Sequence, residues 1–138
     1  MRSPTQKSLK FFREAGFKVD VVEHWVPFVK RRKDLFGFID IVAVSRLFPV
    51  TFGVQTTSYE NVASRVKKIR GLPESTEWLD SKNVVIVQGW KLNKSRRLES
   101  RNLVILPGSV WGTSSTHEMR LVGMDGSTFI RWLKEIIH

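Results

Sequence analysis

The sequence contains no cysteine, which excludes both a disulfide framework and a metal site built on thiolates. It also has no uncharged apolar run long enough to span a bilayer. Its first residues, MRSPTQKSLKFFREAGF, show neither the apolar core nor the small-residue cleavage site of a signal peptide. We therefore expect a cytoplasmic protein whose N-terminal segment belongs to the fold.

Acidic residues are scarce relative to basic ones, with 13 Asp and Glu against 23 Lys and Arg, and the formal net charge is +10. A small protein with so positive a field favours polyanions as partners. We find no strongly amphipathic terminal helix of the kind that lies on membranes, and nucleic acid is therefore the expected partner. A basic surface that serves only solubility is the alternative.

Hydrophobic spacing predicts the order of the elements. Without an internal repeat, a linker or a low-complexity tract, the 138 residues are expected to form one α/β domain. In chain order we expect a helix over residues 5–15, a strand over 18–25, a basic turn over 27–34, a strand over 36–44, a turn over 45–49, a strand over 50–57, a helix over 58–71 and a buried strand over 83–90.

The last third of the chain gives weaker patterns. Residues 91–101 are expected to form a basic loop or a short helix, because five of these eleven residues are Lys or Arg. Short strands are expected over 102–107 and 117–123. Residues 126–138 have the apolar spacing of an amphipathic final helix.

One aspartate interrupts the most apolar of the expected strands. Asp40 stands in the middle of FGFIDIVAV, and a buried carboxylate is costly unless it is paired or binds a cation. Suppose that this strand forms a hairpin with the next one, centred between Leu47 and Phe48. The residue numbers of each cross-strand pair then sum to about 95. Asp40 then lies opposite Gln55.

Side chains two apart in a strand share a face, so Gln55 and Thr57 point the same way. Glu23, from the preceding strand, is placed to join them. Carboxylate, amide and hydroxyl oxygens suit a hard divalent cation such as Mg²⁺, which can polarise a phosphodiester and activate a water for its hydrolysis. The alternative is structural pairing of Asp40 with Lys33, Arg31 or Arg65.

The element order together with FIDIVAV and FGVQTT resembles the PD-(D/E)XK nuclease superfamily, especially archaeal-type and phage Holliday-junction resolvases. In that pattern an aspartate in the second strand is followed, after a hairpin, by an acid-x-lysine triplet in the third. Asp40 matches the aspartate, Gln55 takes the place of the acid, and Thr57 takes the place of the lysine.

The resemblance covers about residues 5–90. It implies a restriction-endonuclease-like αβββαβ core, in which a mixed central sheet is flanked by helices. Residues 91–138 would add C-terminal strands and a terminal helix as an extension. The resemblance also implies Mg²⁺ or Mn²⁺ as cofactor, branched or double-stranded DNA as substrate, and a symmetric homodimer.

The resemblance further implies which residues hold the metal. These are Asp40, Gln55, the backbone carbonyl of Thr56, and Glu23 as the additional acid that many members contribute. Glu14 on the first helix competes with Glu23 for that role. Asp34 is a third possibility, or simply a partner for the basic run KRRK before it.

Threonine in place of the motif lysine is the serious departure, because that lysine is thought to steer the attacking water and to stabilise charge at the phosphate. Either another basic residue supplies the charge or the chemistry is lost. Lys33 is the expected substitute, and Lys30, Arg65 and Lys68 are further candidates.

Basic residues gather in VKRRKD, RVKKIR and KSRRLESR, which are expected to hold the phosphate backbone without reading sequence. Each run could equally be a solvated charged surface. Trp111, in a predicted loop, is the tryptophan most suited to stack on a base. The expected DNA-binding residues are Lys30, Arg31, Arg32, Arg65, Lys68, Lys94, Arg96 and Arg97.

The sequence therefore predicts a divalent-metal-dependent DNA endonuclease that hydrolyses phosphodiester bonds, with Glu23, Asp40, Gln55, Thr57 and Lys33 as catalytic residues. A DNA-binding protein on the same fold, catalytically silent because of Thr57, is the first alternative. A basic RNA-associated protein without a metal site is the second.

Overall fold

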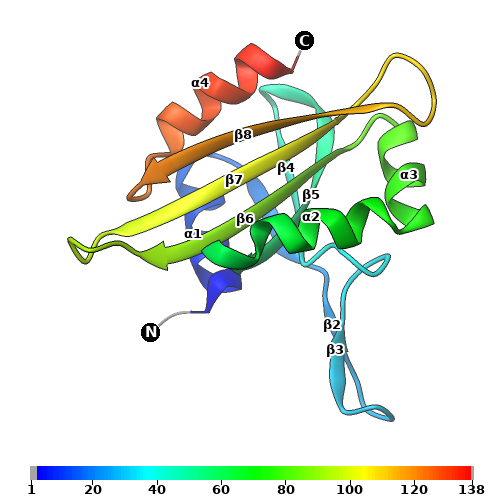
Figure 1. Ribbon diagram of the computed structural model, residues 1–138, viewed down its shortest axis with the longest axis horizontal. Coiled ribbons are helices and arrows are strands. Elements are labelled where there is room, and N and C mark those ends of the chain that lie inside the picture. Colours follow the sequence, from blue (N-terminus) through cyan, green and yellow to red (C-terminus); the bar gives the residue numbers. More distant parts are fainter. Residues whose placement is uncertain (1–2, 138) are drawn as a thin grey trace.

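The computed structural model of the chain describes residues 3–137. A six-stranded sheet forms the centre, helices cover both of its faces, and a separate two-stranded hairpin projects away from the body (Figure 1). In chain order the elements are α1 (Pro4–Glu14), β1 (Lys18–Val21), β2 (His24–Val26), β3 (Arg31–Lys33), β4 (Ile41–Ser45), β5 (Phe48–Ser58), the 3₁₀ helix η1 (Tyr59–Asn61), α2 (Val62–Arg70), α3 (Pro73–Asp80), β6 (Val84–Leu92), β7 (Leu98–Pro107), β8 (Ser114–Val122) and α4 (Gly126–Ile136).

The strand order in the large sheet is β1-β4-β5-β6-β7-β8. β5 and β6 are parallel, because α2 and α3 form the crossover between them, and all other neighbours are antiparallel. The predicted α/β class, with a mixed central sheet flanked by helices, is confirmed. β6 has a strand on either side and is buried until its last two residues, as predicted for 83–90.

Each face of the sheet carries its own apolar core. On one face α1 packs against α4, and Phe11 contacts Phe129 edge to face at 5.2 Å between ring centroids. On the other face α2 and α3 cover the sheet through Val62, Val66, Ile69 and Leu79. Within residues 3–137 no helix has both the length and the apolar character needed to cross a membrane.

Capping residues determine where the first and last helices begin. The Ser3 side chain accepts a hydrogen bond from the Gln6 N–H at 3.2 Å and Pro4 takes the first position of α1. In the same way Asp125 accepts from the Thr128 N–H at 3.1 Å and starts α4. Both helices were predicted, and the last residue of the predicted helix 126–138 lies outside the described residues.

The strand predicted over residues 18–25 is in fact two strands. β1 ends at Val21 because its partner β4 begins at Ile41, and the chain then leaves the large sheet. β2 pairs instead with β3 in the projecting hairpin, so the basic turn predicted over 27–34 contains a strand. The prediction that Glu23 continues the face of the first strand is therefore wrong.

The strand predicted over residues 36–44 is also shorter than expected. It begins as β4 after a tight turn, in which the Ile39 N–H donates to the Leu35 carbonyl at 3.0 Å and Gly37 has a φ of +84°. Ile39 and its neighbour Phe38 are fully buried, and they belong to the core beneath α2 and α3. The apolar residues before Asp40 are therefore core residues in a turn.

The hairpin of β4 and β5 has the predicted register over most of its length, with Ile41 opposite Val54. Beyond Ala43 the register shifts, and Ser45 lies opposite Phe48. The turn is therefore centred between Arg46 and Leu47, one residue earlier than predicted, and that detail of the prediction is wrong. The shift lies at the far end of the hairpin from Asp40.

The helix predicted over residues 58–71 is divided. Ser58, the first residue of the predicted helix, instead ends β5, and its side chain makes no capping hydrogen bond. η1 follows, and α2 starts at Val62. Pro73 is the first residue of a further helix, α3. Proline suits this position because its missing N–H has no partner there in any case.

Residues 91–101 do not form a loop or a short helix. β6 continues to Leu92, which pairs with Leu98 at the start of β7. Between them the Asn93 side chain accepts hydrogen bonds from the backbone N–H groups of Ser95 and Arg97 at 2.9 and 3.0 Å. Such side-chain hydrogen bonds stabilise a tight turn between the two strands. The sequence did not predict this turn, because its basic and polar residues resemble those of a longer loop.

Candidate metal and nucleic-acid site

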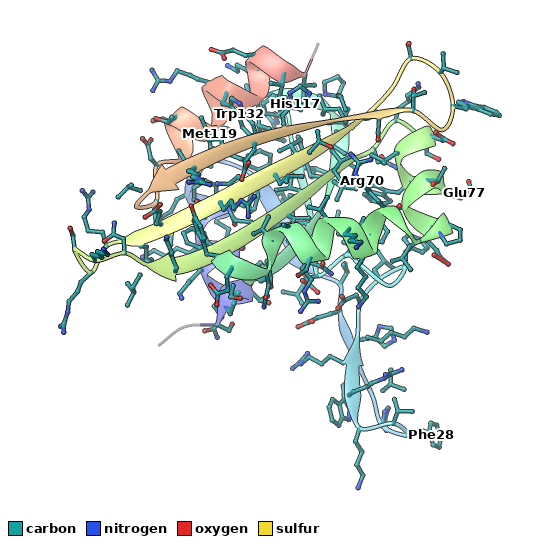
Figure 2. The ribbon with its side chains drawn as sticks, viewed as in Figure 1. Phe28, Arg70, Glu77, His117, Met119 and Trp132 are labelled. Carbon is teal, nitrogen blue, oxygen red and sulfur yellow. The ribbon has the colours of Figure 1, made fainter. Side chains whose placement is uncertain are left out.

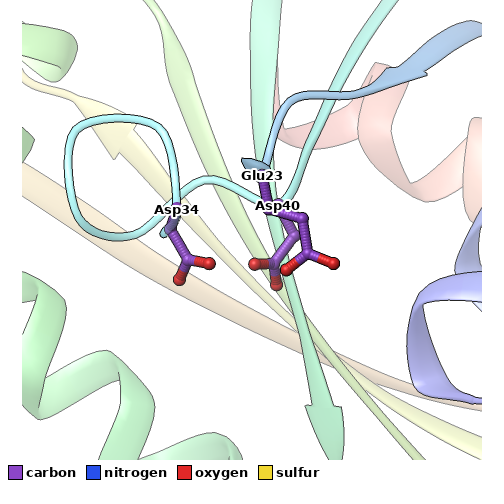
Figure 3. A group of neighbouring side chains, drawn as sticks. All are labelled: Glu23, Asp34 and Asp40. Atoms are coloured by element: carbon purple, nitrogen blue, oxygen red, sulfur yellow. The ribbon is translucent and has the colours of Figure 1, made fainter. Parts of the chain in front are cut away.

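Three carboxylates from separate segments meet beside β5 (Figure 3). Glu23 lies between β1 and β2, Asp34 follows β3, and Asp40 precedes β4. One carboxylate oxygen from each residue lies within 4.8 Å of the other two. Figure 3 shows the three side chains pointing in the same direction. The prediction that Glu23 would approach Asp40 is confirmed.

Asp40 is the most deeply buried of the three, with 6% of its surface exposed. Its backbone N–H donates to the Val54 carbonyl at 2.9 Å, and its Oδ2 accepts from the Thr56 N–H at 2.9 Å. These bonds hold Asp40 across from Gln55, as predicted. In the described part of the chain no ion pair joins Asp40 to Lys33, Arg31 or Arg65, so structural pairing is not what keeps it there.

The surroundings raise the pKa of Asp40 from 3.8 to about 8. The largest cause is burial, which penalises the charged form. A side-chain hydrogen bond with Asp34 and the negative charges of Asp34 and Glu23 act in the same direction, while the hydrogen bond from the Thr56 N–H opposes them. Without a cation, the carboxyl of Asp40 therefore keeps its proton at neutral pH.

Gln55 is 2% exposed and lies beside the carboxylates. Its Nε2 donates to Asp34 Oδ2 at 3.3 Å and to the Phe38 carbonyl at 3.1 Å. Its Oε1, predicted as a metal ligand, is buried and accepts no hydrogen bond in the described structure. Gln55 thus orients Asp34, and its role as a ligand stays a prediction.

The β2–β3 hairpin explains how Asp34 reaches the cluster. Trp25 pairs with Arg32 and His24 with Lys33, so the next step of the same register sets Glu23 opposite Asp34. Sequence reasoning gave Asp34 no definite role because the hairpin was taken for a turn. The register of β2 with β3 was the signal that would have found it.

A polar cavity of about 350 Å³ opens beside the cluster. Arg65 of α2 is the one basic residue that lines it within the described chain, whereas Lys33 lies exposed on the hairpin. Thr56 lines it as well, and its hydroxyl lies 3.0 Å from that of Thr5 at the start of α1. The lining residues are Pro4, Thr5, Glu23, Asp34, Asp40, Thr56, Thr57, Ser58, Asn61 and Arg65.

The packing of α2 on the sheet sets the position of Arg65. A Cβ placed on Gly89 of β6 would lie 2.4 Å from Val62 Cγ2 and 2.8 Å from the Ser58 carbonyl oxygen. Only glycine therefore lets η1 and the start of α2 lie this close to β6. This contact holds Asn61 and Arg65 at the cavity.

The other predicted residues lie elsewhere. Glu14 pairs with Lys10 on α1 at 4.0 Å and is not part of the acidic cluster. Lys30, Arg31 and Arg32 are exposed on the hairpin, and Arg32 Nη1 lies 3.9 Å from Glu23 Oε1. The remaining predicted DNA-binding residues are exposed on α2 (Lys68) or in the β6–β7 turn (Lys94, Arg96 and Arg97).

Comparison of the chain with protein-family models, with curated proteins and with solved structures gave no match. The resemblance to PD-(D/E)XK nucleases therefore rests on the residues and the element order given above. The functional argument that follows depends on the geometry of the site.

Replacing Asp40 by asparagine should change how stability depends on pH. In the folded protein the pKa of Asp40 is above its unfolded value of about 3.9, so unfolding releases a proton between about pH 4 and pH 8. Raising the pH through this window therefore lowers the free energy of unfolding of the wild type, by up to about 1.4 kcal/mol per pH unit. Asp40→Asn cannot release this proton and should lack the decline.

Denaturant unfolding at several pH values, in the presence of a chelator, measures the difference. Glu135→Gln, which removes an exposed carboxylate from α4, is the matched control and should follow the wild type. Parallel curves for wild type and Asp40→Asn would contradict the assignment of a protonated, buried Asp40.

Proposed function

We propose that this chain is a divalent-metal-dependent DNA endonuclease that hydrolyses phosphodiester bonds, with branched DNA of the Holliday-junction type as its substrate class. The observation that carries the proposal is the convergence of Glu23, Asp34 and Asp40 within 4.8 Å. A protein with a net charge of +10 does not need three carboxylates this close together for its stability. A proton or a metal cation would relieve their mutual repulsion.

The residues present fit Mg²⁺ or Mn²⁺. All the donors are oxygens, as hard cations require, and the buried Oε1 of Gln55 has no other partner in the described structure. Glu23, Asp34 and Asp40 would hold the ion, with Gln55 orienting Asp34. Bound there, the ion would supply Lewis acidity toward the phosphodiester and an activated water.

The protein itself supplies binding and orientation of the DNA backbone. Arg65 lines the cavity, and its guanidinium can bind two phosphate oxygens at once. Pro4 and Thr5 bring the first turn of α1 to the same cavity, where the positive end of the helix dipole favours an anion. The basic residues of the hairpin and of α2 would bind the flanking phosphates independently of sequence.

Arg65 also answers the question that Thr57 raises. Thr57 is buried beside the cavity and carries no charge, so it cannot stabilise a developing negative charge as lysine would. Arg65 can do so, but it does not deprotonate in proteins and so cannot serve as a base. We therefore assign charge stabilisation to Arg65. Lys33, the substitute expected from the sequence, is kept as a phosphate-binding residue on the hairpin.

A catalytically silent DNA-binding protein is the second function, and the observation that favours it is Thr57 itself. Pairing of two copies, which cutting both strands of a junction would require, stays a prediction. A cleavage assay with branched and unbranched DNA shows whether the protein cuts and whether it cuts both strands of a junction.

The purified protein should cut four-way-junction DNA in the presence of Mg²⁺ or Mn²⁺ and not in EDTA. Asp40→Asn should slow cleavage by more than about 100-fold, because even groups that only orient metal ligands contribute about 10- to 100-fold. Gln55→Ala, as such an orienting residue, should fall within that smaller range. Glu135→Gln should cut like the wild type.

Cleavage rates are measured on labelled junction and linear duplex, with DNA binding measured separately by fluorescence anisotropy. Tight binding without cleavage under either metal would contradict the endonuclease and favour the silent DNA-binding protein. Cleavage that survives Asp40→Asn would show that the chemistry lies elsewhere.

Replacing Arg65 by alanine should lower the cleavage rate at saturating DNA by about 100-fold or more, the usual cost of removing a donor that stabilises developing charge. Arg65→Lys should recover part of the rate. Lys134→Ala removes an exposed cation from α4, on the other face of the sheet, and should change nothing. Single-turnover kinetics separate the rate from the affinity, and an Arg65→Ala effect on affinity alone would contradict the role.

A further inference from the structure

The β2–β3 hairpin has no packing role that accounts for its composition. It forms a two-stranded sheet of its own and projects from the body of the protein (Figures 1 and 2). An isolated hairpin of this size gains little stability from its own contacts. Its exposed residues are therefore better explained by what they bind than by what they stabilise.

The tip of the hairpin is apolar and aromatic. Phe28 is 98% exposed and stands at the far end of the hairpin in Figure 2. Val29 and Trp25 beside it are also more than half exposed. The turn is held by the Lys30 N–H, which donates to the Pro27 carbonyl at 3.3 Å. The fold thus presents an aromatic ring to solvent on a defined turn.

Positive charge follows the tip directly. Lys30, Arg31, Arg32 and Lys33 are consecutive and all exposed, and β3 offers no carboxylate of its own. An apolar tip followed by a basic strand matches nucleic acid, in which charged phosphates lie beside stacked bases. Proteins that bend or open DNA insert apolar side chains, Phe and Leu among them, between base steps.

The hairpin is also continuous with the acidic cluster. Glu23 immediately precedes β2 and Asp34 immediately follows β3, so both of its ends are residues of the cluster. Phe28 is five residues beyond Glu23, or about 16 Å at about 3.3 Å per residue of extended chain. With bases spaced about 3.4 Å apart, the tip would reach a point within about five nucleotides of the cluster.

We propose that the β2–β3 hairpin is a DNA-insertion element, in which Phe28 enters the base stack at a branch point while Lys30 to Lys33 hold the flanking phosphates. The inference rests on the proposed function in one respect, namely that the ligand is DNA. A branch point suits the element because its bases are already partly unstacked, which lowers the cost of insertion.

The insertion is tested with four-way-junction DNA that carries 2-aminopurine at the branch point, in EDTA so that no strand is cut. The wild type should increase the emission of this base analogue by unstacking it. A label placed more than ten nucleotides away should not respond. Phe28→Ala should lose most of the increase and bind the junction about tenfold more weakly, in line with the contribution of one stacked aromatic side chain.

Two further variants make the result specific. Phe28→Leu keeps an apolar wedge and should retain much of the emission change. Leu47→Ala removes another exposed apolar side chain, 54% exposed in the β4–β5 turn, and should behave like the wild type. Because Phe28 lies outside both cores, Phe28→Ala should unfold at the wild-type temperature.

Equal emission changes for wild type and Phe28→Ala would overturn the proposal. It would also be overturned if Phe28→Ala left the DNA signal intact and instead abolished sedimentation with anionic vesicles, or self-association in the ultracentrifuge. Cleavage is then measured after Mn²⁺ has been added in excess of the EDTA, so that insertion and nuclease activity are tested independently. Emission changes without cleavage would support insertion alone, and cleavage with no Phe28-dependent emission would support the nuclease alone.

Discussion

The burial of the Asp40 carboxyl at the start of β4 is the constraint on which the rest of the site depends. The Thr56 N–H holds it at 2.9 Å, and the carboxyls of Glu23 and Asp34 lie within 4.8 Å. Burial and like charges raise the pKa of Asp40 to about 8, so the folded protein carries an electrostatic cost that a divalent cation would remove. Such a cost is common at sites of chemistry, where the surrounding fold enforces an arrangement that is unfavourable on its own.

Two hairpins enforce this arrangement. The β4–β5 hairpin sets Asp40 against Gln55, and the β2–β3 hairpin sets Glu23 against Asp34. Gln55 links the two by donating one hydrogen bond to Asp34. The crossover through α2 then adds Arg65 to the same cavity, at a distance that the glycine in β6 allows. The cavity is therefore lined by Arg65 and three acids, a composition suited to a metal ion and a phosphate together.

Much of this could be predicted from the sequence, because strand pairing has a period of two and hairpin partners have a fixed number sum. The pairing of Asp40 with Gln55 followed from those rules. The central position of β6 followed from its continuous apolar run, and the mixed sheet was implied by the resemblance. The turn before Asp40 was missed because its buried Phe38 and Ile39 resemble strand residues. The hairpin of β2 and β3 was missed because the five consecutive charged residues from Lys30 to Asp34 resemble a loop, and Asp34 was therefore named only as a third possibility for the additional acid. The α3 helix was missed because Pro73 can end one helix or begin another.

The most direct test of the account is a crystal structure of the protein soaked in Mn²⁺, with anomalous scattering recorded to locate the ion. The account predicts one strong peak bounded by the carboxylates of Glu23, Asp34 and Asp40, and no peak at this place in crystals of Asp40→Asn. Absence of a peak there in the wild type at millimolar Mn²⁺, with the three carboxylates still within 4.8 Å of one another, would contradict the central claim that the cluster is a metal site.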